Sequence, residues 1–211
     1  MSGTSPGAER ASELPPTAWA VLGMLSFGRD LSGYDLKKWA DNSLRFFYWS
    51  PASSQIYAEL RRLEERGFVT SKVAAQDDLR NKRLFTITTL GRDAISDWVQ
   101  HSPVEPPVLK HSVALRAWLG HLADPDRLRA VVGEHRDNSA ELARQADGAA
   151  TTAAKTPGWE YPALVTRWSQ RYFEAEQRLA EEMLADLDEL ARGCVPGCVG
   201  PGDRCLDENQ R

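Results

Sequence analysis

Apolar residues recur at helical spacing in the first part of the chain, starting with the segment LPPTAWAVLGMLSFG. Leu14, Ala18, Leu22 and Leu25 share one face of a helix at spacings of three and four residues. Two prolines stand where a helix tolerates them, in its first turn, and Gly28 stands where a helix commonly ends. The pattern predicts a mostly buried first helix.

Two further segments repeat this pattern. In GYDLKKWADNSLRFFYW, Ser32 is the expected N-cap, and the inward stripe consists of Leu36, Trp39, Ala40 and Leu44. In SPASSQIYAELRRLEERGFV, we expect Ser50 to be the N-cap because Pro51 then occupies the first helical position. The apolar stripe of this third helix is Ile56, Leu60 and Leu63, and Gly67 suits a left-handed C-terminal residue.

The periodicity then changes from helical to alternating. Residues 68–75 and 83–89 are rich in β-branched and aromatic residues, and the polar stretch QDDLRN lies between them, which predicts a β-hairpin. Thr88 is placed to cap a fourth helix, LGRDAISDWVQ. Three helices, a hairpin and a helix within residues 14–101 have the size of one small domain.

The second half of the chain reads as helical throughout. A proline-rich linker, residues 102–107, precedes a helical domain over residues 108–192, with helices at Leu109–Leu122, from Asp124-Pro125 onward, and at about 163–191. The last helix has near-heptad apolar spacing, which predicts packing along a partner helix. Its expected dimer-interface residues are Leu164, Trp168, Tyr172, Leu179, Met183 and Leu187. Residues 1–13 and 193–211 are expected to be disordered tails.

Composition and charge narrow the function classes. The 211 residues carry a net charge of −4, but residues 14–100 hold 12 Lys and Arg against 10 Asp and Glu, whereas residues 101–211 hold 13 against 18. The basic excess therefore falls on the N-terminal half. No apolar run is long enough to span a bilayer, and the N-terminus lacks a signal-peptide pattern. We expect a cytoplasmic protein with no membrane partner.

The start of the third helix carries the chemistry of a nucleic-acid reader. Ser53, Ser54 and Gln55 are short or polar side chains next to the free N–H groups of a first helical turn, which suit a phosphate. Glutamine pairs bidentately with adenine, and serine reaches several base edges. Tyr57 and Arg61 lie on the following turns, and the hairpin tip adds a basic cluster of Arg80, Asn81, Lys82 and Arg83. The fold class expected is mainly α with a small β-hairpin: a winged helix-turn-helix followed by a helical dimerisation domain.

The same residues resemble the PadR family of bacterial transcriptional regulators. The resemblance rests on GYD at 33–35, SQIYAELRRLEERGFV at 54–69 and RLFTITTLGR at 83–92, and it spans roughly residues 16–100. It implies a homodimeric DNA-binding protein, usually a repressor, whose C-terminal helices form the dimer. It adds Tyr34 to the DNA-binding candidates. Many members release DNA on binding a small aromatic molecule, which makes Trp19, Trp98 and Trp168 the candidate effector-binding residues.

Other readings of the sequence are open. An enzyme is not expected, because no HExxH motif, phosphate-binding glycine loop or nucleophile elbow is present. No cofactor or metal is expected, although Cys194, Cys198 and Cys205 in the tail allow a metal-binding or redox role. The rival function is a helical module that binds protein or small molecules and uses a winged-helix fold without contacting DNA.

Overall fold

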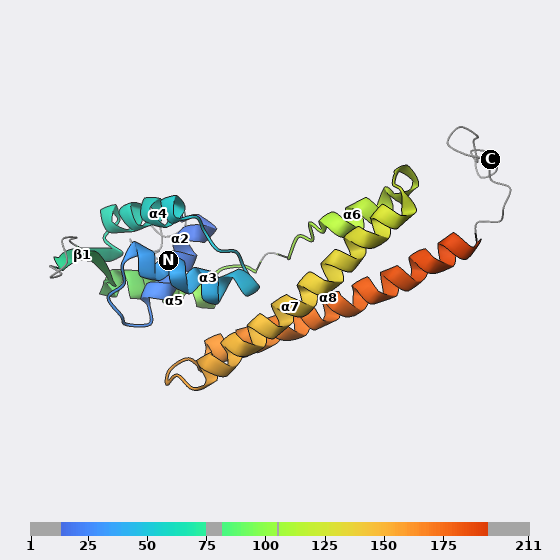
Figure 1. Cartoon of the computed structure of the whole chain (residues 1–211). Helices are drawn as coiled ribbons and strands as arrows, with labels where there is room; N and C mark the ends of the chain where they lie inside the picture. Colours follow the sequence, from blue (N-terminus) through green and yellow to red (C-terminus); the bar gives the residue numbers. More distant parts are fainter. Residues whose placement is uncertain (1–13, 75–81, 105, 194–211) are drawn as a thin grey trace. The chain divides into compact units, whose positions relative to one another are not determined.

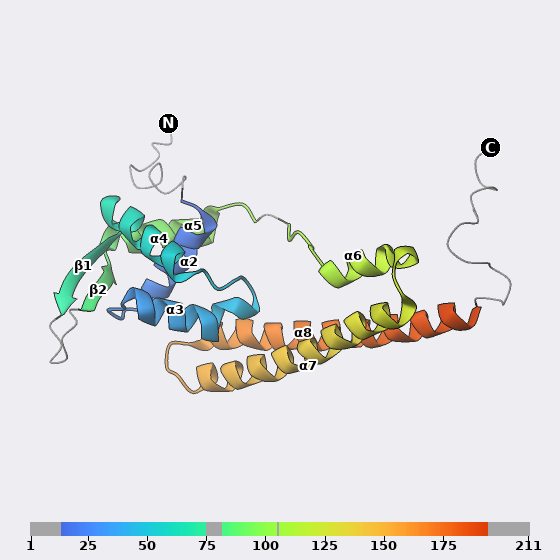
Figure 2. The same ribbon diagram turned by 45° about the horizontal axis from the view of Figure 1, so that its top comes forward.

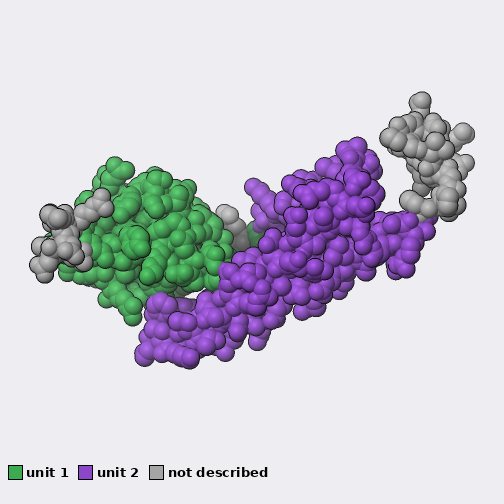
Figure 3. Space-filling model, viewed as in Figure 1, with its two compact units in different colours: residues 1–107 green, residues 108–211 purple. Residues whose placement is uncertain are grey.

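The computed structural model describes residues 14–74, 82–104 and 106–193. The chain divides into two compact units, residues 1–107 and 108–211, which are coloured separately in Figure 3. The described residues of the first unit form four α-helices and a hairpin, and those of the second form mainly two long helices (Figure 1). The predicted class, mainly α with a small hairpin, is confirmed. The predicted tip residues Arg80 and Asn81, and the three cysteines, lie outside the described residues.

The first two helices begin where the sequence predicts. Helix α2 spans Pro16–Leu25 and has proline in its first turn. Helix α3 spans Gly33–Asn42 and opens with a capping box. The Ser32 hydroxyl accepts the Asp35 N–H at 3.2 Å, and the Asp35 carboxylate accepts the Ser32 N–H at 3.0 Å. This helix stops earlier than the apolar stripe suggests, because the chain turns into a short 3₁₀ helix, η1, at Leu44–Phe46.

Helix α4 spans Ser53–Glu65, so the predicted N-cap at Ser50 is wrong. The Ser50 hydroxyl is engaged elsewhere, donating to Asp41 and accepting from Lys37 at 3.1 Å. Ala52 occupies the N-cap position, and its N–H donates to Gln55 Oε1 at 2.8 Å. The side chain three residues into the helix therefore replaces the serine as the local cap. At the other end, Gly67 adopts φ +76°, as the sequence predicts.

The hairpin is formed by strands β1, Val69–Ala74, and β2, Lys82–Ile87, which pair antiparallel with Val69 opposite Ile87. Leu31 adds a contact that the pattern did not predict. Its backbone exchanges hydrogen bonds with Phe85 at 2.9 and 3.1 Å, which ties the segment before α3 to the hairpin.

Helix α5, Thr89–His101, follows the hairpin, and the predicted Thr88 cap is confirmed. The Thr88 hydroxyl accepts the Gly91 N–H at 3.0 Å and donates to the Gly67 carbonyl at 2.8 Å.

The core of the first unit lies between α2, α3, α4 and the hairpin. Side chains from each element are fully or nearly fully buried there, and each such aliphatic or aromatic side chain stabilises the fold by about 1.5–3 kcal/mol. The largest are Leu22, Leu25, Leu36, Ile56, Leu60, Leu63 and Phe68. Because α4 buries Ile56, Leu60 and Leu63 on one side, its opposite face is held rigidly toward solvent.

The second unit is a pair of long antiparallel helices with a short helical segment packed against them (Figure 2). The predicted helix at Leu109–Leu122 is shorter than expected: α6 spans Ser112–Trp118, and the 3₁₀ helix η2 spans Gly120–Leu122. Asp124 caps α7, Pro125–Ala154, by accepting the Arg127 N–H at 2.9 Å. Helix α8 spans Glu160–Gly193, beginning a little before the predicted start.

Small side chains let α7 and α8 approach closely. The buried positions of the two helices include Ala146, Ala150 and Ala153 on α7, and Ala163, Thr166 and Ser169 on α8. The near-heptad stripe of α8 lies beside this contact and is largely exposed within one chain. None of the described helices combines the length and apolar character needed to cross a membrane.

Candidate functional site

The first turn of α4 presents polar side chains to solvent. Ser53, Ser54 and Gln55 are all exposed, although Gln55 Oε1 is used as the cap of the helix. The cap uses the Oε1 acceptor of Gln55 and not its Nε2 donors. The first N–H groups of a helix have no acceptor within the helix. Together with the exposed hydroxyls they form a surface that suits phosphate and base edges.

Tyr57 packs against the start of α3. A Cβ atom added at Gly33 would lie 2.5 Å from Tyr57 Cε1, so only glycine allows the ring to rest on this backbone. Tyr34, the next residue, is 69% exposed, and Arg61 is exposed one turn further along α4. The solvent-exposed faces of α3 and α4 therefore carry three of the predicted DNA-binding residues: Tyr34, Tyr57 and Arg61.

Lys82 and Arg83, the two described cations of the predicted basic tip cluster, are paired within the chain. Lys82 Nζ lies 2.9 Å from Asp35 Oδ2, the same carboxylate that caps α3. Arg83 donates to Glu64 at 2.6 Å and to the Ser71 hydroxyl at 2.8 Å. The Arg83–Glu64 pair could not be predicted from local sequence, because the two residues are 19 positions apart. Arg83 thus links the hairpin to the C-terminal turn of α4.

Glu64 is held ionised by this arrangement. Ser71 donates to one of its carboxylate oxygens at 2.6 Å and Arg83 to the other. The Ser71 hydrogen bond lowers the pKa of the Glu64 carboxyl, and the Arg83 guanidinium adds to the effect against the opposing cost of burial. A DNA phosphate near Arg83 would compete with a charged carboxylate.

The candidate effector residues fall into two places. Trp19 of α2 and Trp98 of α5 stack with ring centroids 5.2 Å apart, and Trp98 is 40% exposed. Trp168 belongs to the second unit, where it stacks on Tyr172 at 5.6 Å. The Trp19–Trp98 pair is an aromatic surface within the first unit, and its role as a ligand site stays a prediction.

The predicted dimer stripe of α8 is exposed at most of its positions. Leu164, Trp168, Tyr172 and Leu179 are exposed, whereas Met183 and Leu187 are partly buried. A row of large apolar side chains in water is typical of an association surface, so the geometry keeps this prediction open.

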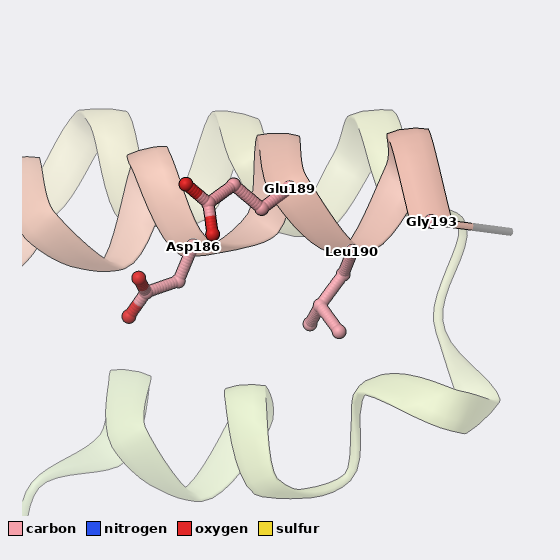
Figure 4. Close-up of a pocket in the computed structure, with 4 residues that line it drawn as sticks. All are labelled: Asp186, Glu189, Leu190 and Gly193. Atoms are coloured by element: carbon pink, nitrogen blue, oxygen red, sulfur yellow. The ribbon is translucent and has the colours of Figure 1, made fainter.

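A shallow pocket lies along the last turns of α8, lined by Asp186, Glu189, Leu190 and Gly193 (Figure 4). Its polar groups are carboxylates, which repel phosphate. This pocket is therefore no part of a nucleic-acid surface.

One constellation escaped the sequence patterns altogether. His111 Nε2 and His135 Nε2 lie 3.0 and 3.2 Å from Glu176 Oε2, at sequence separations of 65 and 41 residues. No local motif links them, since one residue comes from the start of α6, one from α7 and one from α8.

Comparison with known proteins finds a family model that matches part of the chain. Residues 21–97 match the model of the transcriptional regulator PadR-like family. The negative transcriptional regulator PadR of Bacillus subtilis is 37% identical over 101 residues, which are 47% of this chain and 54% of that protein. The chain thus spans about half the length of this curated relative. The matched family and this relative are transcriptional regulators and not enzymes.

Solved structures extend the likeness in fold to both units. The crystal structure of B. subtilis PadR in complex with operator DNA matches with a TM-score of 0.72 at 24% identity, covering 82% of this chain and all of that one. The same regulator in complex with p-coumaric acid matches with a TM-score of 0.64 at 22% identity, covering 88% and 99%. At these identities the likeness shows the fold.

Proposed function

Because residues 21–97 form a PadR-like domain, we propose that this protein is a transcriptional regulator that binds a palindromic operator as a homodimer. The observation that carries the proposal is the exposed polar first turn of α4, Ser53 to Gln55, on a winged fold whose opposite helix face is buried. This turn enters the major groove as the start of a recognition helix, and the hairpin lies along the backbone.

The regulation proposed is repression, relieved by a small aromatic molecule. Repression is supported by the relative's description as a negative regulator, and an aromatic effector by the relative's p-coumaric acid complex. The Trp19–Trp98 stack supplies an aromatic surface in this chain, and Trp168 is a second candidate.

A titration with DNA from upstream of the protein's own gene tests the core of this proposal. Binding should weaken steeply as salt rises, because cationic side chains replace counterions on phosphates. The rival function is a winged module that binds only protein or small molecules. It predicts that the protein binds the upstream DNA no more tightly than unrelated DNA.

Arg83 gives the first specific prediction. Arg83→Ala should weaken binding to all sequences alike and lower the salt slope by about one unit. Glu64→Gln should tighten binding by up to roughly fivefold, because an exposed ion pair worth at most ~1 kcal/mol no longer competes with phosphate. Fluorescence anisotropy across a salt series measures both effects. The matched control is the double variant Glu64→Gln with Arg83→Ala: an equal gain without the arginine would show that Glu64 does not act through it.

Gln55 gives the second. Gln55→Ala should cost on the order of 1–3 kcal/mol of binding and relax specificity at one base. It also removes the acceptor of the Ala52 N–H, so stability must be followed in parallel. Gln55→Glu is the control, since it keeps that acceptor but lacks the amide donor. Binding to a set of operator variants should show both substitutions relaxing the same base, and unchanged base preference in Gln55→Glu would exclude the adenine contact.

A further inference from the structure

Three side chains from separate parts of the second unit meet at one point. His111 stands at the N-cap of α6, His135 is on α7 and Glu176 is on α8. Their facing atoms, two Nε2 nitrogens and a carboxylate oxygen, all lie within 4.8 Å of one another. The side chains are 12–25% exposed, so the point is shielded from bulk water yet reachable from it.

We propose that the His111–His135–Glu176 cluster binds a divalent transition-metal ion of the zinc type. Two imidazole nitrogens and a carboxylate are a ligand set that Zn²⁺ takes up in open sites, with water at the fourth position. With bonds of about 2.0–2.1 Å, tetrahedral donor atoms stand roughly 3.3–3.4 Å apart. The observed separations of 3.0 and 3.2 Å from the histidines to Glu176 differ little from that spacing.

The surroundings of Glu176 suit a metal ligand. Burial raises the pKa of its carboxyl, but hydrogen bonds with His111 and His135 outweigh burial, and its pKa lies below the ordinary value. Tyr172 lowers the pKa of this carboxyl further.

The metal competes with an existing hydrogen bond of His111. His111 Nδ1 accepts the Ala114 N–H at 3.0 Å, so in the metal-free ring the proton sits on Nε2 and is donated to Glu176. Metal at Nε2 requires the other tautomer of the ring, so the Nε2 proton leaves, one proton is taken up from water at Nδ1, and the ring stays neutral. The Ala114 N–H then loses the acceptor that caps the start of α6. Metal loading should therefore loosen the start of α6.

Calorimetric titration with Zn²⁺ tests the site in the full-length chain. Because thiolates also bind zinc, the chain carries Cys194→Ser, Cys198→Ser and Cys205→Ser. We expect one Zn²⁺ per chain, and at least a tenfold loss of affinity in His135→Ala and in Glu176→Gln. His121→Ala is the matched control, since this histidine is exposed and stands outside the cluster. Mg²⁺ in excess should not compete, because it prefers oxygen ligands.

Two further measurements keep the outcome decisive. Circular dichroism establishes that each variant is folded, and His135→Gln replaces His135→Ala if the latter is not. Hydrogen exchange at Ala114 should quicken on loading in the parent and not in Glu176→Gln. No Zn²⁺ binding by the parent, or affinity that survives both cluster substitutions, would mean that the three residues form only a hydrogen-bonded network.

Discussion

Gly91→Ala is expected to destabilise the first unit by roughly 3 kcal/mol or more, a large share of a small domain's stability. A Cβ at this position would lie 2.2 Å from the Phe68 carbonyl oxygen and 3.0 Å from Ile87 Cγ1. The oxygen belongs to backbone that pairs with Thr88, so neither side of the contact moves cheaply. Relief requires α5 to shift away from the hairpin, which also strains the Thr88 cap at the Gly91 N–H.

Gly23→Ala is the matched control in the same unit. Gly23 lies inside α2, and its added Cβ would meet only Ile95 Cδ1 at 3.4 Å, an ordinary contact. Alanine favours a helix interior by up to ~1 kcal/mol over glycine, so this variant should be as stable as the parent or slightly more so. Urea denaturation, monitored by hydrogen exchange of core amides in residues 14–101, measures the free energy of unfolding of both variants. Equal stability of both variants would contradict the close approach at Gly91.

Most helix starts could be predicted from the sequence, because they depend on residues that are close together along the chain. Ser32, Thr88 and Asp124 each cap the helix that the sequence assigns to them, because a cap depends on neighbours three residues away. The predicted start of α4 was wrong because the side chain of the expected cap binds residues of another helix. Ser50 looks like a cap in sequence, but Asp41 and Lys37, from the preceding helix, take its hydroxyl.

The candidate site was harder to predict than the fold, because some of its contacts join residues far apart in the sequence. The exposed turn at Ser53–Gln55 follows from the apolar stripe of Ile56, Leu60 and Leu63, which periodicity reveals. The pairing of Arg83 with Glu64 does not, because it arises only when the hairpin folds back on α4. The histidine cluster was hidden for the same reason: its members come from three helical elements and have no common spacing.

The largest loss of function is expected from charges in the stripe of α8. We expect Leu179→Glu with Leu187→Glu to produce monomers that no longer hold the operator. Leu179 is 57% exposed in the single chain, and the simplest cover for such a stripe is the same helix of a second copy. A dimer would bury both glutamates without partners, at several kcal/mol, which the monomer avoids. Sedimentation velocity and operator titration measure the two losses.

Loss of the dimer should cause loss of operator binding because the operator has two half-sites. A two-fold dimer presents two recognition helices to half-sites about 34 Å apart, or a multiple of that spacing, and each monomer grips only one. Ala185→Glu is the control: it adds a glutamate to the same helix at an exposed position outside the apolar stripe, so it should leave both assembly and binding unchanged. A parent that sediments as a monomer, or a double variant that stays dimeric and binds normally, would remove α8 from the interface. Monomers that still bind the full operator at parental affinity would instead separate assembly from recognition, because one recognition helix would then suffice.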